Sequence, residues 1–366
     1  MKWSWSLGRL AGIDVRIHAT FLLLLAYVAY VGYERGGTAR AALFGVIFLL
    51  LLFASVVAHE LGHALTARRF GVATRNITLL PIGGVAQLER MPREPKQELL
   101  IALAGPAVTL VIAVLLYVFL RLTGTTLSRV TLADDPSLLV SLLFTNVTIL
   151  IFNMLPAFPM DGGRVLRAAL AMRLDYVRAT QIAASLGKAF ALLFGLFGLW
   201  SQEPLMILIA LFVWMGAAGE AVSTQFRSSL HGVTVDRAMI RDVRTLSPDE
   251  PLAAAVQQAR SGFQHDFPVV VDGRVVGVLT RKSLVSTLAR RGPSATVAEA
   301  MDTAFVTAAS TEPLDEAFAR LSECRCHTMP VVRDGVLEGV LTTDSVGEFV
   351  SVESALDGGR KKRTVA

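Results

Sequence analysis

Long apolar stretches are the feature that most limits how this chain can fold. Six of them are mostly apolar and approach the length of about 20 residues that a membrane-crossing helix needs. They cover residues 18–33, 41–67, 98–121, 138–156, 177–200 and 203–222. The whole chain is 53% hydrophobic and only 18% charged, which is unusual for a soluble globular protein. We therefore predict a polytopic α-helical membrane protein with about six transmembrane helices.

The basic residues between these stretches predict the orientation of the chain. Six crossings place both termini on one side, and the segments assigned to that side hold Lys2, Arg9, Arg16, Arg68, Arg69, Arg75, Arg90, Arg93, Lys96, Arg164, Arg167, Arg173 and Arg178. The segments assigned to the other side hold only Arg35, Arg40, Arg121 and Arg129. Cytoplasmic loops are enriched in Lys and Arg, so we expect a multi-pass protein of the plasma or inner membrane with cytosolic termini. The basic residues form no face with interleaved aromatics, and we expect no nucleic-acid partner.

The last third of the chain has soluble composition and contains an internal repeat. FPVVVDGRVVGVLT at 267–280 aligns without gaps with MPVVRDGVLEGVLT at 329–342. Each unit reads as helix, strand, Asp-Gly turn, strand and helix, which predicts a cytosolic α/β tandem domain. We place a transmembrane domain at 1–225, a linker at 226–235, the repeats at 236–292 and 293–353, and a disordered basic tail at 354–366. Cys324 and Cys326 are too close for an unstrained disulfide in a regular element, so we expect both to be reduced.

Two further segments outside the apolar stretches have recognisable character. The N-terminal segment contains Lys2, Arg9 and Arg16 and precedes the first apolar stretch. We interpret it as a positively charged segment before a first helix that is kept in the mature protein and not removed as a signal peptide. Residues 72–92, VATRNITLLPIGGVAQLERMP, alternate in polarity around Gly83 and Gly84. This pattern predicts a membrane-associated β-hairpin or an exposed edge strand, with an ordinary cytosolic turn as the alternative.

Ionisable residues interrupt the end of the second apolar stretch. His59 and His63 are four residues apart, so on a helix both imidazoles face the same way, with Glu60 beside them. H-E-x-x-H is the metalloprotease pattern, in which two histidines bind a metal and the carboxylate takes a proton from water at the metal. An Asp, Lys or Arg near the bilayer centre costs roughly 2.5 to 3.5 kcal/mol, so an apolar stretch avoids ionisable groups unless a site needs them. The alternative is that these residues are solvated among lipid headgroups.

A third metal ligand must come from elsewhere, because a catalytic zinc has three protein ligands and one open position. FNMLPAFPMDGGRVLRA at 152–168 breaks the end of the fourth apolar stretch, and such irregular backbone is tolerated at membrane depth only where protein or water covers it. Asp161 is the candidate. Asp161 could instead cap the following helix, but capping does not explain the preceding Asn153, Pro156 and Pro159.

Together these residues resemble the site-2 protease family of intramembrane zinc metalloproteases, in the branch with a C-terminal pair of CBS domains. The resemblance rests on His59-Glu60-Leu61-Gly62-His63, on Asn153-x-x-Pro156-x-x-Pro159-x-Asp161-Gly162, on Gly83-Gly84 and on the repeat, and it covers essentially the whole chain. It implies one Zn²⁺ per chain held by His59, His63 and Asp161. It also implies that Glu60 is the general base, that Asn153 lies near the substrate, and that the Gly83-Gly84 loop pairs with an unwound substrate segment.

The reaction implied is hydrolysis of a peptide bond in or near a transmembrane segment of another protein, in bacteria usually a membrane-anchored transcriptional regulator. The partners implied are this substrate, membrane lipid and a second copy joined through the CBS domains. A transporter with regulatory CBS domains and an inactive homologue are the competing readings. A transporter would distribute polar residues along several helices, whereas here they concentrate in two motifs.

The sequence departs from the family pattern at two places. Thr109 stands where the family usually has Asn in its G-P-x-x-N motif. CBS domains that bind adenosine nucleotides commonly carry an Asp that holds the ribose, and here Ser283 and Ser345 occupy that place, with Asp344 one residue early. Thr280, Thr342 and Asp344 are the candidate contacts for an adenine nucleotide, and regulation or dimerisation without nucleotide is the alternative.

Overall fold

The computed structural model describes residues 3–81, 83–88, 94–124, 137–262, 264–324 and 327–364. The chain separates into two compact units, Met1–Val222 and Ser223–Ala366. Lys2, Arg90, Arg93 and Arg129, which enter the orientation argument, lie outside the described residues.

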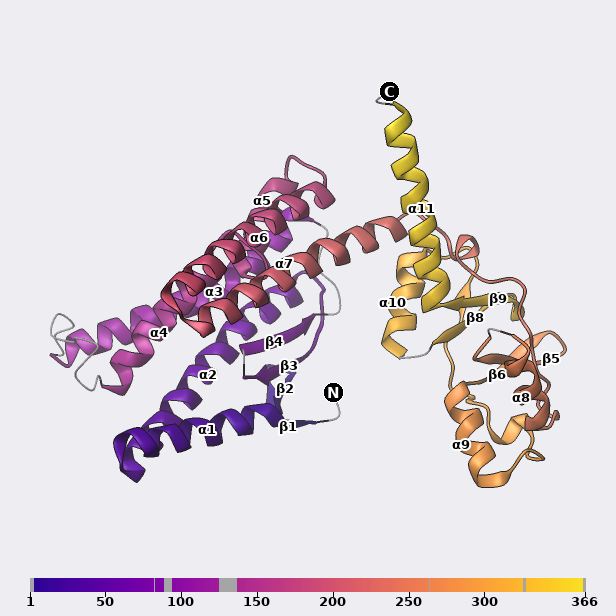
Figure 1. Ribbon diagram of the computed structural model, residues 1–366, viewed down its shortest axis with the longest axis horizontal. Coiled ribbons are helices and arrows are strands. Elements are labelled where there is room, and N and C mark those ends of the chain that lie inside the picture. The colour runs from indigo at the N-terminus through magenta and orange to yellow at the C-terminus, as the bar shows by residue number, and fades with distance from the viewer. Residues whose placement is uncertain are drawn as a thin grey trace. The chain divides into compact units, whose positions relative to one another are not determined.

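Each of the six predicted apolar stretches forms a helix in the first unit (Figure 1). These helices are α1 (Ala19–Gly36), α2 (Ala39–Arg69), α3 (Pro95–Leu122), α4 (Leu138–Asn153), α6 (Tyr176–Ser201) and α7 (Pro204–Leu230), and a short helix, α5 (Asp161–Ala171), follows α4. Among the described residues, α2, α3, α6 and α7 are long and apolar enough to cross a membrane, and α4 is a shorter apolar helix. The predicted long apolar helices are present, four of them with membrane-spanning length, while the number of about six crossings stays a prediction.

The first unit also contains a four-stranded sheet, of which the sequence analysis anticipated only half. The predicted hairpin is present as the antiparallel pair β3 (Thr74–Leu80) and β4 (Gly83–Leu88). The N-terminal segment, which we expected to be only a positively charged segment before the first helix, forms a second hairpin from β1 (Ser4–Leu10) and β2 (Ile13–His18). The strand order is β1-β2-β3-β4, so β1 and β4 are the edges. The strands gather beside the C-terminal part of α2 (Figure 1).

One face of this sheet packs against α2. Val15 on β2 and Leu79 on β3 are buried with Phe21 of α1 and with Phe53 and Val57 of α2. Farther along α2, a second cluster joins Ile13, Ile77 and Ala64. The α2 segment that carries the H-E-x-x-H pattern is therefore fixed against the sheet.

The second unit has the predicted repeat. The first copy comprises α8 (Leu252–Arg260), β5 (Phe267–Val271), β6 (Arg274–Leu279) and α9 (Arg281–Arg291). The second comprises α10 (Leu314–Cys324), β8 (Thr328–Arg333), β9 (Val336–Thr342) and α11 (Thr343–Thr364), and the short strand β7 (Ala308–Ala309) and two 3-10 turns (Val235–Arg237 and Val297–Glu299) complete the unit. The five strands form one sheet in the order β5-β6-β9-β8-β7.

The Asp-Gly turns predicted at the centre of each repeat are both present. Asp272 and Gly273 join β5 to β6 with φ values of 50° and 78°, and Asp334 and Gly335 join β8 to β9 with φ values of 53° and 83°. Positive φ at both central residues is the geometry that Asp-Gly favours in two-residue hairpins.

The structure differs from the sequence prediction near the two ends of the second unit and at Cys324. Residues 226–230, expected in a linker, are the last part of α7, and α11 continues to Thr364, past residue 354 where a disordered tail was expected. A helix that has already formed adds further residues cooperatively. Cys324 is disulfide-bonded, contrary to the expectation of a reduced thiol, whereas Cys326 lies outside the described residues. Cys324 is the last residue of α10, so an argument based on regular helix geometry does not apply there.

Candidate metal centre

Three side chains from two distant segments meet inside the first unit. Nε2 of His59 lies 3.1 Å from Oδ2 of Asp161, and Nε2 of His63 lies 3.2 Å from the same oxygen. The two Nε2 atoms are 3.1 Å apart. Both histidines are buried, and the Asp161 side chain is 13% exposed. The predicted meeting of the two motifs is thus present as a compact group of atoms that could hold a metal ion.

Asp161 does not act as the cap of the helix that it begins. The N-cap of α5 is Met160, and no side chain caps this helix. The irregular segment 154–160, predicted from its prolines, turns the chain between α4 and α5. Gly162 and Gly163 let α5 lie directly on that segment, because a Cβ atom would come within 2.2 Å of the Leu155 carbonyl oxygen at Gly162 and within 2.5 Å of the Phe158 nitrogen at Gly163. This close packing frees the Asp161 carboxylate to face the two imidazoles.

The second nitrogen of each imidazole is held by α3. Nδ1 of His63 lies 2.7 Å from the carbonyl oxygen of Ile101, and Nδ1 of His59 lies 2.9 Å from the hydroxyl of Thr109. A carbonyl oxygen only accepts, so His63 carries a proton on Nδ1, and in the neutral ring its Nε2 is an acceptor. The Thr109 hydroxyl is aimed at the carbonyl of Gly105, 3.4 Å away, which leaves its oxygen to accept from Nδ1 of His59. Each Nε2 lone pair is therefore available to a metal, as is usual where the other ring nitrogen donates to a fixed acceptor.

Gly105 brings α3 close enough to make these contacts. A Cβ atom at this position would lie 2.2 Å from Nε2 of His63 and 2.7 Å from Nε2 of His59. Gly62 lies next to His63 on α2 and allows the same close approach of α2 and α3. A Cβ atom on Gly62 would lie 2.8 Å from the carbonyl oxygen of Ala104 on α3. Any side chain at position 105 would occupy the space between the ring nitrogens.

Glu60 points toward the edge strand of the sheet. A Cβ atom on Gly84 would lie 2.8 Å from Cγ of Glu60 and 3.0 Å from a methyl group of Val56. Gly84 pairs with Leu79 across the β3–β4 hairpin, on the face that packs against α2. The backbone of β4 therefore passes directly beside Glu60.

A buried ion pair holds α5, and with it Asp161, against the neighbouring helices. Arg167 is 1% exposed, and its Nε donates to Glu98 of α3 at 2.7 Å. Its Nη1 donates to Glu220 of α7 at 2.5 Å. The guanidinium also lies over the rings of Phe158 and Tyr176, at 4.9 and 5.0 Å from their centroids. The helix that supplies Asp161 is thus joined by charge to the helix that supplies Gly105 and Thr109.

Two family models match this chain. Residues 47–135 and 128–194 match the model of peptidase family M50, and residues 235–290 and 297–350 match the CBS domain. A zinc metalloprotease of Methanocaldococcus jannaschii is 31% identical over 279 residues, which are 76% of this chain and 78% of the relative. The chain belongs to peptidase family M50, the site-2 protease family.

Two further relatives extend the comparison. Rip3 of Mycobacterium tuberculosis is 29% identical to this M50 peptidase over 387 residues, 96% of this chain and 94% of the relative. The solved structure of a site-2 protease from Methanocaldococcus jannaschii is 39% identical, covers 60% of this chain and 95% of that one, and has a TM-score of 0.46.

The remaining predicted residues of this M50 peptidase lie in several places. Asn153 is the last residue of α4 and is half-buried. Thr280 caps α9 by accepting from the backbone N–H of Ser283 at 3.1 Å, and the Ser283 hydroxyl donates to Asp302 at 3.0 Å. In the second CBS domain, Thr342 and Ser345 bond each other's backbone N–H groups, and Asp344 is exposed on the first turn of α11.

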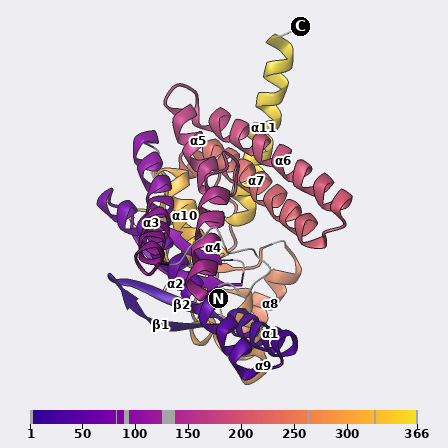
Figure 2. The ribbon, with the colours of Figure 1, turned by 90° about the vertical axis from the view of Figure 1, so that its left-hand side faces the viewer.

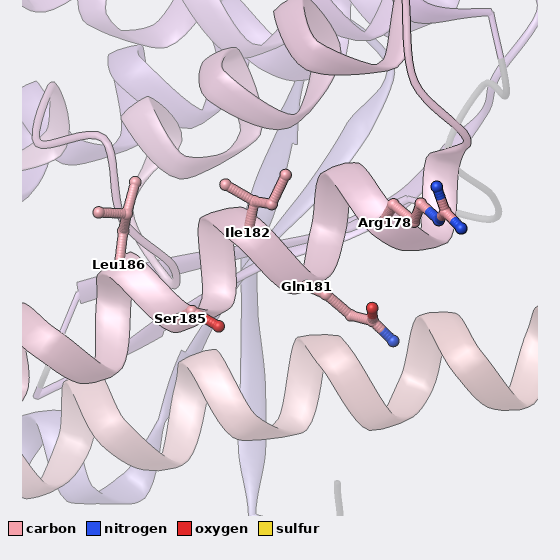
Figure 3. A pocket seen from close by; sticks show the side chains of 5 residues that line it. All are labelled: Arg178, Gln181, Ile182, Ser185 and Leu186. Atoms are coloured by element: carbon pink, nitrogen blue, oxygen red, sulfur yellow. The ribbon is translucent and has the colours of Figure 1, made fainter. Parts of the chain in front are cut away.

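A shallow hollow on α6 is separate from the candidate metal centre. It is lined by Arg178, Gln181, Ile182, Ser185 and Leu186, which project from one helix (Figure 3). None of these is a predicted site residue of the M50 peptidase, so the hollow does not enlarge the candidate centre.

Sequence reasoning missed the residues that position the candidate ligands and do not themselves belong to the ligand set. Ile101 contributes a backbone carbonyl, which no sequence pattern reports, and Arg167 was counted only as a basic residue for membrane orientation. Thr109 was noted as a departure from the G-P-x-x-N pattern, and its position one helical turn after Gly105 is the signal that could have placed it beside His59.

Proposed function

We propose that this metalloprotease hydrolyses a peptide bond in or near a transmembrane segment of a membrane-anchored protein, with one zinc ion held by His59, His63 and Asp161. The observation that carries the proposal is the convergence of two imidazole Nε2 atoms and a carboxylate oxygen within 3.2 Å, inside a bundle of membrane-length helices. Three such acceptors repel one another unless a cation lies between them, and a histidine–histidine–carboxylate set suits Zn²⁺.

The arrangement of hydrogen bonds fits this metal. Both Nδ1 atoms face acceptors on α3, so both Nε2 lone pairs converge, and the space between them exists because residue 105 is glycine. When bound, zinc supplies a Lewis acid that polarises a carbonyl and makes water more acidic. Glu60 is the general base in this proposal: it accepts the proton of the attacking water and returns it to the nitrogen of the leaving amine.

The edge strand beside Glu60 supports substrate binding by strand addition. β4 is an edge of the sheet, and an edge strand presents backbone groups with which an extended peptide can pair. We infer that an unwound substrate segment adds beside Gly83 and Gly84, which brings its backbone next to Glu60. Unwinding is required, because the carbonyls of a transmembrane helix are already hydrogen-bonded. Asn153 contacts the same segment from the end of α4.

We further propose a membrane orientation, a substrate class and a role for the CBS pair. The basic segments support cytosolic termini and about six crossings in the plasma or inner membrane. A membrane-anchored transcriptional regulator is the substrate class that we propose. The CBS pair regulates cleavage or joins two copies, and an adenine nucleotide at Thr280, Thr342 and Asp344 is one means of regulation. The hydroxyl oxygens of Thr280 and Thr342 already accept hydrogen bonds from backbone N–H groups at helix starts. They therefore have less hydrogen-bonding capacity left for a nucleotide than a free hydroxyl would have.

The deciding experiment measures zinc content and cleavage on the same purified protein. Wild type, His59→Ala, Asp161→Ala and Glu60→Gln are reconstituted with a generic single-span substrate. We expect about one zinc per chain in wild type and Glu60→Gln, loss of zinc in the two ligand variants, and a fall in cleavage of about 100- to 10,000-fold in Glu60→Gln. Folded wild-type protein that binds no divalent metal, or cleavage untouched by Glu60→Gln, would refute the proposal.

A further inference from the structure

The N-terminal hairpin has one polar and one apolar face, and part of the apolar face is uncovered. Directly opposed residues in paired strands lie on the same face of a sheet. Trp5 is opposite Ile17, and Leu10 is opposite Ile13. Ile13 and Ile17 pack toward α1 and α2, so Trp5 and Leu10 lie on this helix-facing side of the sheet. Trp5 is nevertheless 56% exposed and Leu10 49% exposed, because β1 is the edge strand.

The opposite face of the hairpin is charged. Ser6 is opposite Arg16, and Arg9 is opposite Asp14. The Ser6 hydroxyl and Nε of Arg16 both donate to the Asp14 carboxylate at 2.6 Å. These hydrogen bonds hold the pKa of Asp14 below its usual value, and the bond from Ser6 has the larger effect, followed by that from Arg16. This face therefore stays charged at neutral pH.

Both ends of the hairpin are tied to ends of apolar helices. At one end, the backbone N–H of Ala19, the first residue of α1, donates to the carbonyl of Trp3 at 2.9 Å. At the other end, Nη1 of Arg68, in the last turn of α2, donates to the carbonyl of Ala11 at 2.9 Å. The helix α2 has membrane-spanning length, and α1 begins with exposed Leu22 and Leu23. The hairpin therefore lies across the level at which these helices leave the membrane, and Figure 2 shows β1 and β2 at the periphery of the first unit.

We propose that the helix-facing side of β1 rests on the phospholipid interface, with Trp5 and Leu10 inserted at headgroup level. The helix-facing side of a sheet that lies across helix ends is also its membrane-facing side, so lipid can cover the part of it that α1 and α2 leave exposed. Tryptophan favours this boundary, since its ring is apolar and its N–H can remain hydrated. Arg9 and Arg16 on the other face stay in water near anionic headgroups. The hairpin would thereby fix the depth of the sheet whose far edge, β4, passes beside Glu60.

Fluorescence quenching on the reconstituted full chain tests this proposal without reference to zinc or cleavage. The chain has four tryptophans. Trp3, Trp200 and Trp214 are replaced by Phe, which leaves Trp5 alone. In two matched controls Trp5 is also replaced by Phe, and the single tryptophan is introduced on the charged face by Ser6→Trp or by Arg9→Trp. The vesicles contain phosphatidylcholine and phosphatidylglycerol, with phosphatidylcholine brominated either near the glycerol end or near the methyl end of its acyl chain, and iodide is the aqueous quencher.

We expect Trp5 to be quenched more by bromine near the glycerol end than by bromine near the methyl end, and to be protected from iodide. The Ser6→Trp and Arg9→Trp controls should instead show strong iodide quenching, red-shifted emission and little quenching by bromine at either position. Equal iodide quenching of Trp5 and of the controls would overturn the proposal. Protection of Trp5 from both iodide and bromine would also overturn it, because protein and not lipid would then cover this face. Two controls are used because Ser6→Trp removes a hydrogen bond to Asp14, whereas Arg9→Trp keeps it.

Discussion

The hydroxyl oxygen of Thr109 lies 2.9 Å from Nδ1 of His59, in a position to fix the ring with Nε2 directed at Asp161. We expect Thr109→Val to weaken zinc binding by about 10- to 100-fold, the usual effect of removing a hydrogen-bond partner of a metal ligand. Zinc affinity is measured by competition with a chelating dye.

Two further substitutions at position 109 serve as matched comparisons for Thr109→Val. Thr109→Ser keeps an acceptor and should bind zinc nearly as wild type does, and Thr109→Asn, the residue usual in the family, should also retain affinity. Thr148→Val removes a threonine hydroxyl that bonds its own helix at an exposed site and should change nothing. Equal zinc affinity in Thr109→Val and wild type would show that Thr109 does not position His59.

Gly105→Ala should prevent metal binding without unfolding the protein. The added methyl group would lie 2.2 Å from Nε2 of His63, between the atoms proposed to hold zinc. We expect zinc content after dialysis to fall to near zero, while the protein stays folded with a stability loss of about 1 to 3 kcal/mol relative to metal-free wild type, because the methyl group overfills the buried site. Gly219→Ala is the control, because its methyl group would meet no atom within 4 Å. Full zinc occupancy in Gly105→Ala would contradict the proposed ligand geometry.

Gly84→Val should reduce cleavage while leaving zinc bound. A side chain at this position pushes against Glu60 and Val56, and displacing a catalytic group by about 1 Å can cost about 100-fold in rate. Cleavage and zinc content are measured together. Val85→Ala, which changes an exposed side chain on the opposite face of β4, is the control and should cleave normally. A Gly84→Val protein with normal cleavage would argue against an approach of substrate beside Glu60.

Arg167→Met should destabilise the first unit by about 3 to 5 kcal/mol, because it leaves Glu98 charged and buried without its partner. The side chains of Arg167 and Glu98 are 2% and 1% exposed. Denaturant unfolding in detergent, followed by circular dichroism, measures the loss. Adding Glu98→Gln to Arg167→Met should recover part of the stability, since the unpaired charge is then absent. A single variant as stable as wild type would show that the ion pair does not hold α5.

The apolar stretches and the two membrane motifs predicted much of the architecture because their signals are local. Runs of leucine and phenylalanine give helices at all six places, and the i, i+4 spacing of His59 and His63 puts both rings on one side of α2. The Asp-Gly turns follow from backbone preference alone. The meeting of His59 with Asp161 was anticipated because both motifs fall at the ends of helices assigned the same direction.

Interactions between segments were not predictable in the same way. The β1–β2 hairpin is stabilised by pairing with β3, some sixty residues later in the chain, and its own short alternation of Trp, Ser and Leu was hidden by the basic residues around it. The pairing of Arg167 with Glu98 depends on how α3 and α5 pack, so a positive charge that looked like an orientation signal is largely buried inside the protein. The register between α2 and α3 decides that Thr109 and Ile101 face the imidazoles, and no single-helix pattern contains that register.

The separation of the candidate ligands along the chain has a consequence for biosynthesis. His59 precedes Asp161 by 102 positions, and α3, α4 and the irregular segment lie between them. A growing polypeptide that has inserted only α1 to α4 contains both imidazoles and Glu60 but lacks the carboxylate of Asp161. Such an intermediate has two of the three ligands that a catalytic zinc requires. With His59, His63 and Asp161 as the proposed zinc ligands, we expect cleavage to begin only after α5 has emerged from the ribosome and docked.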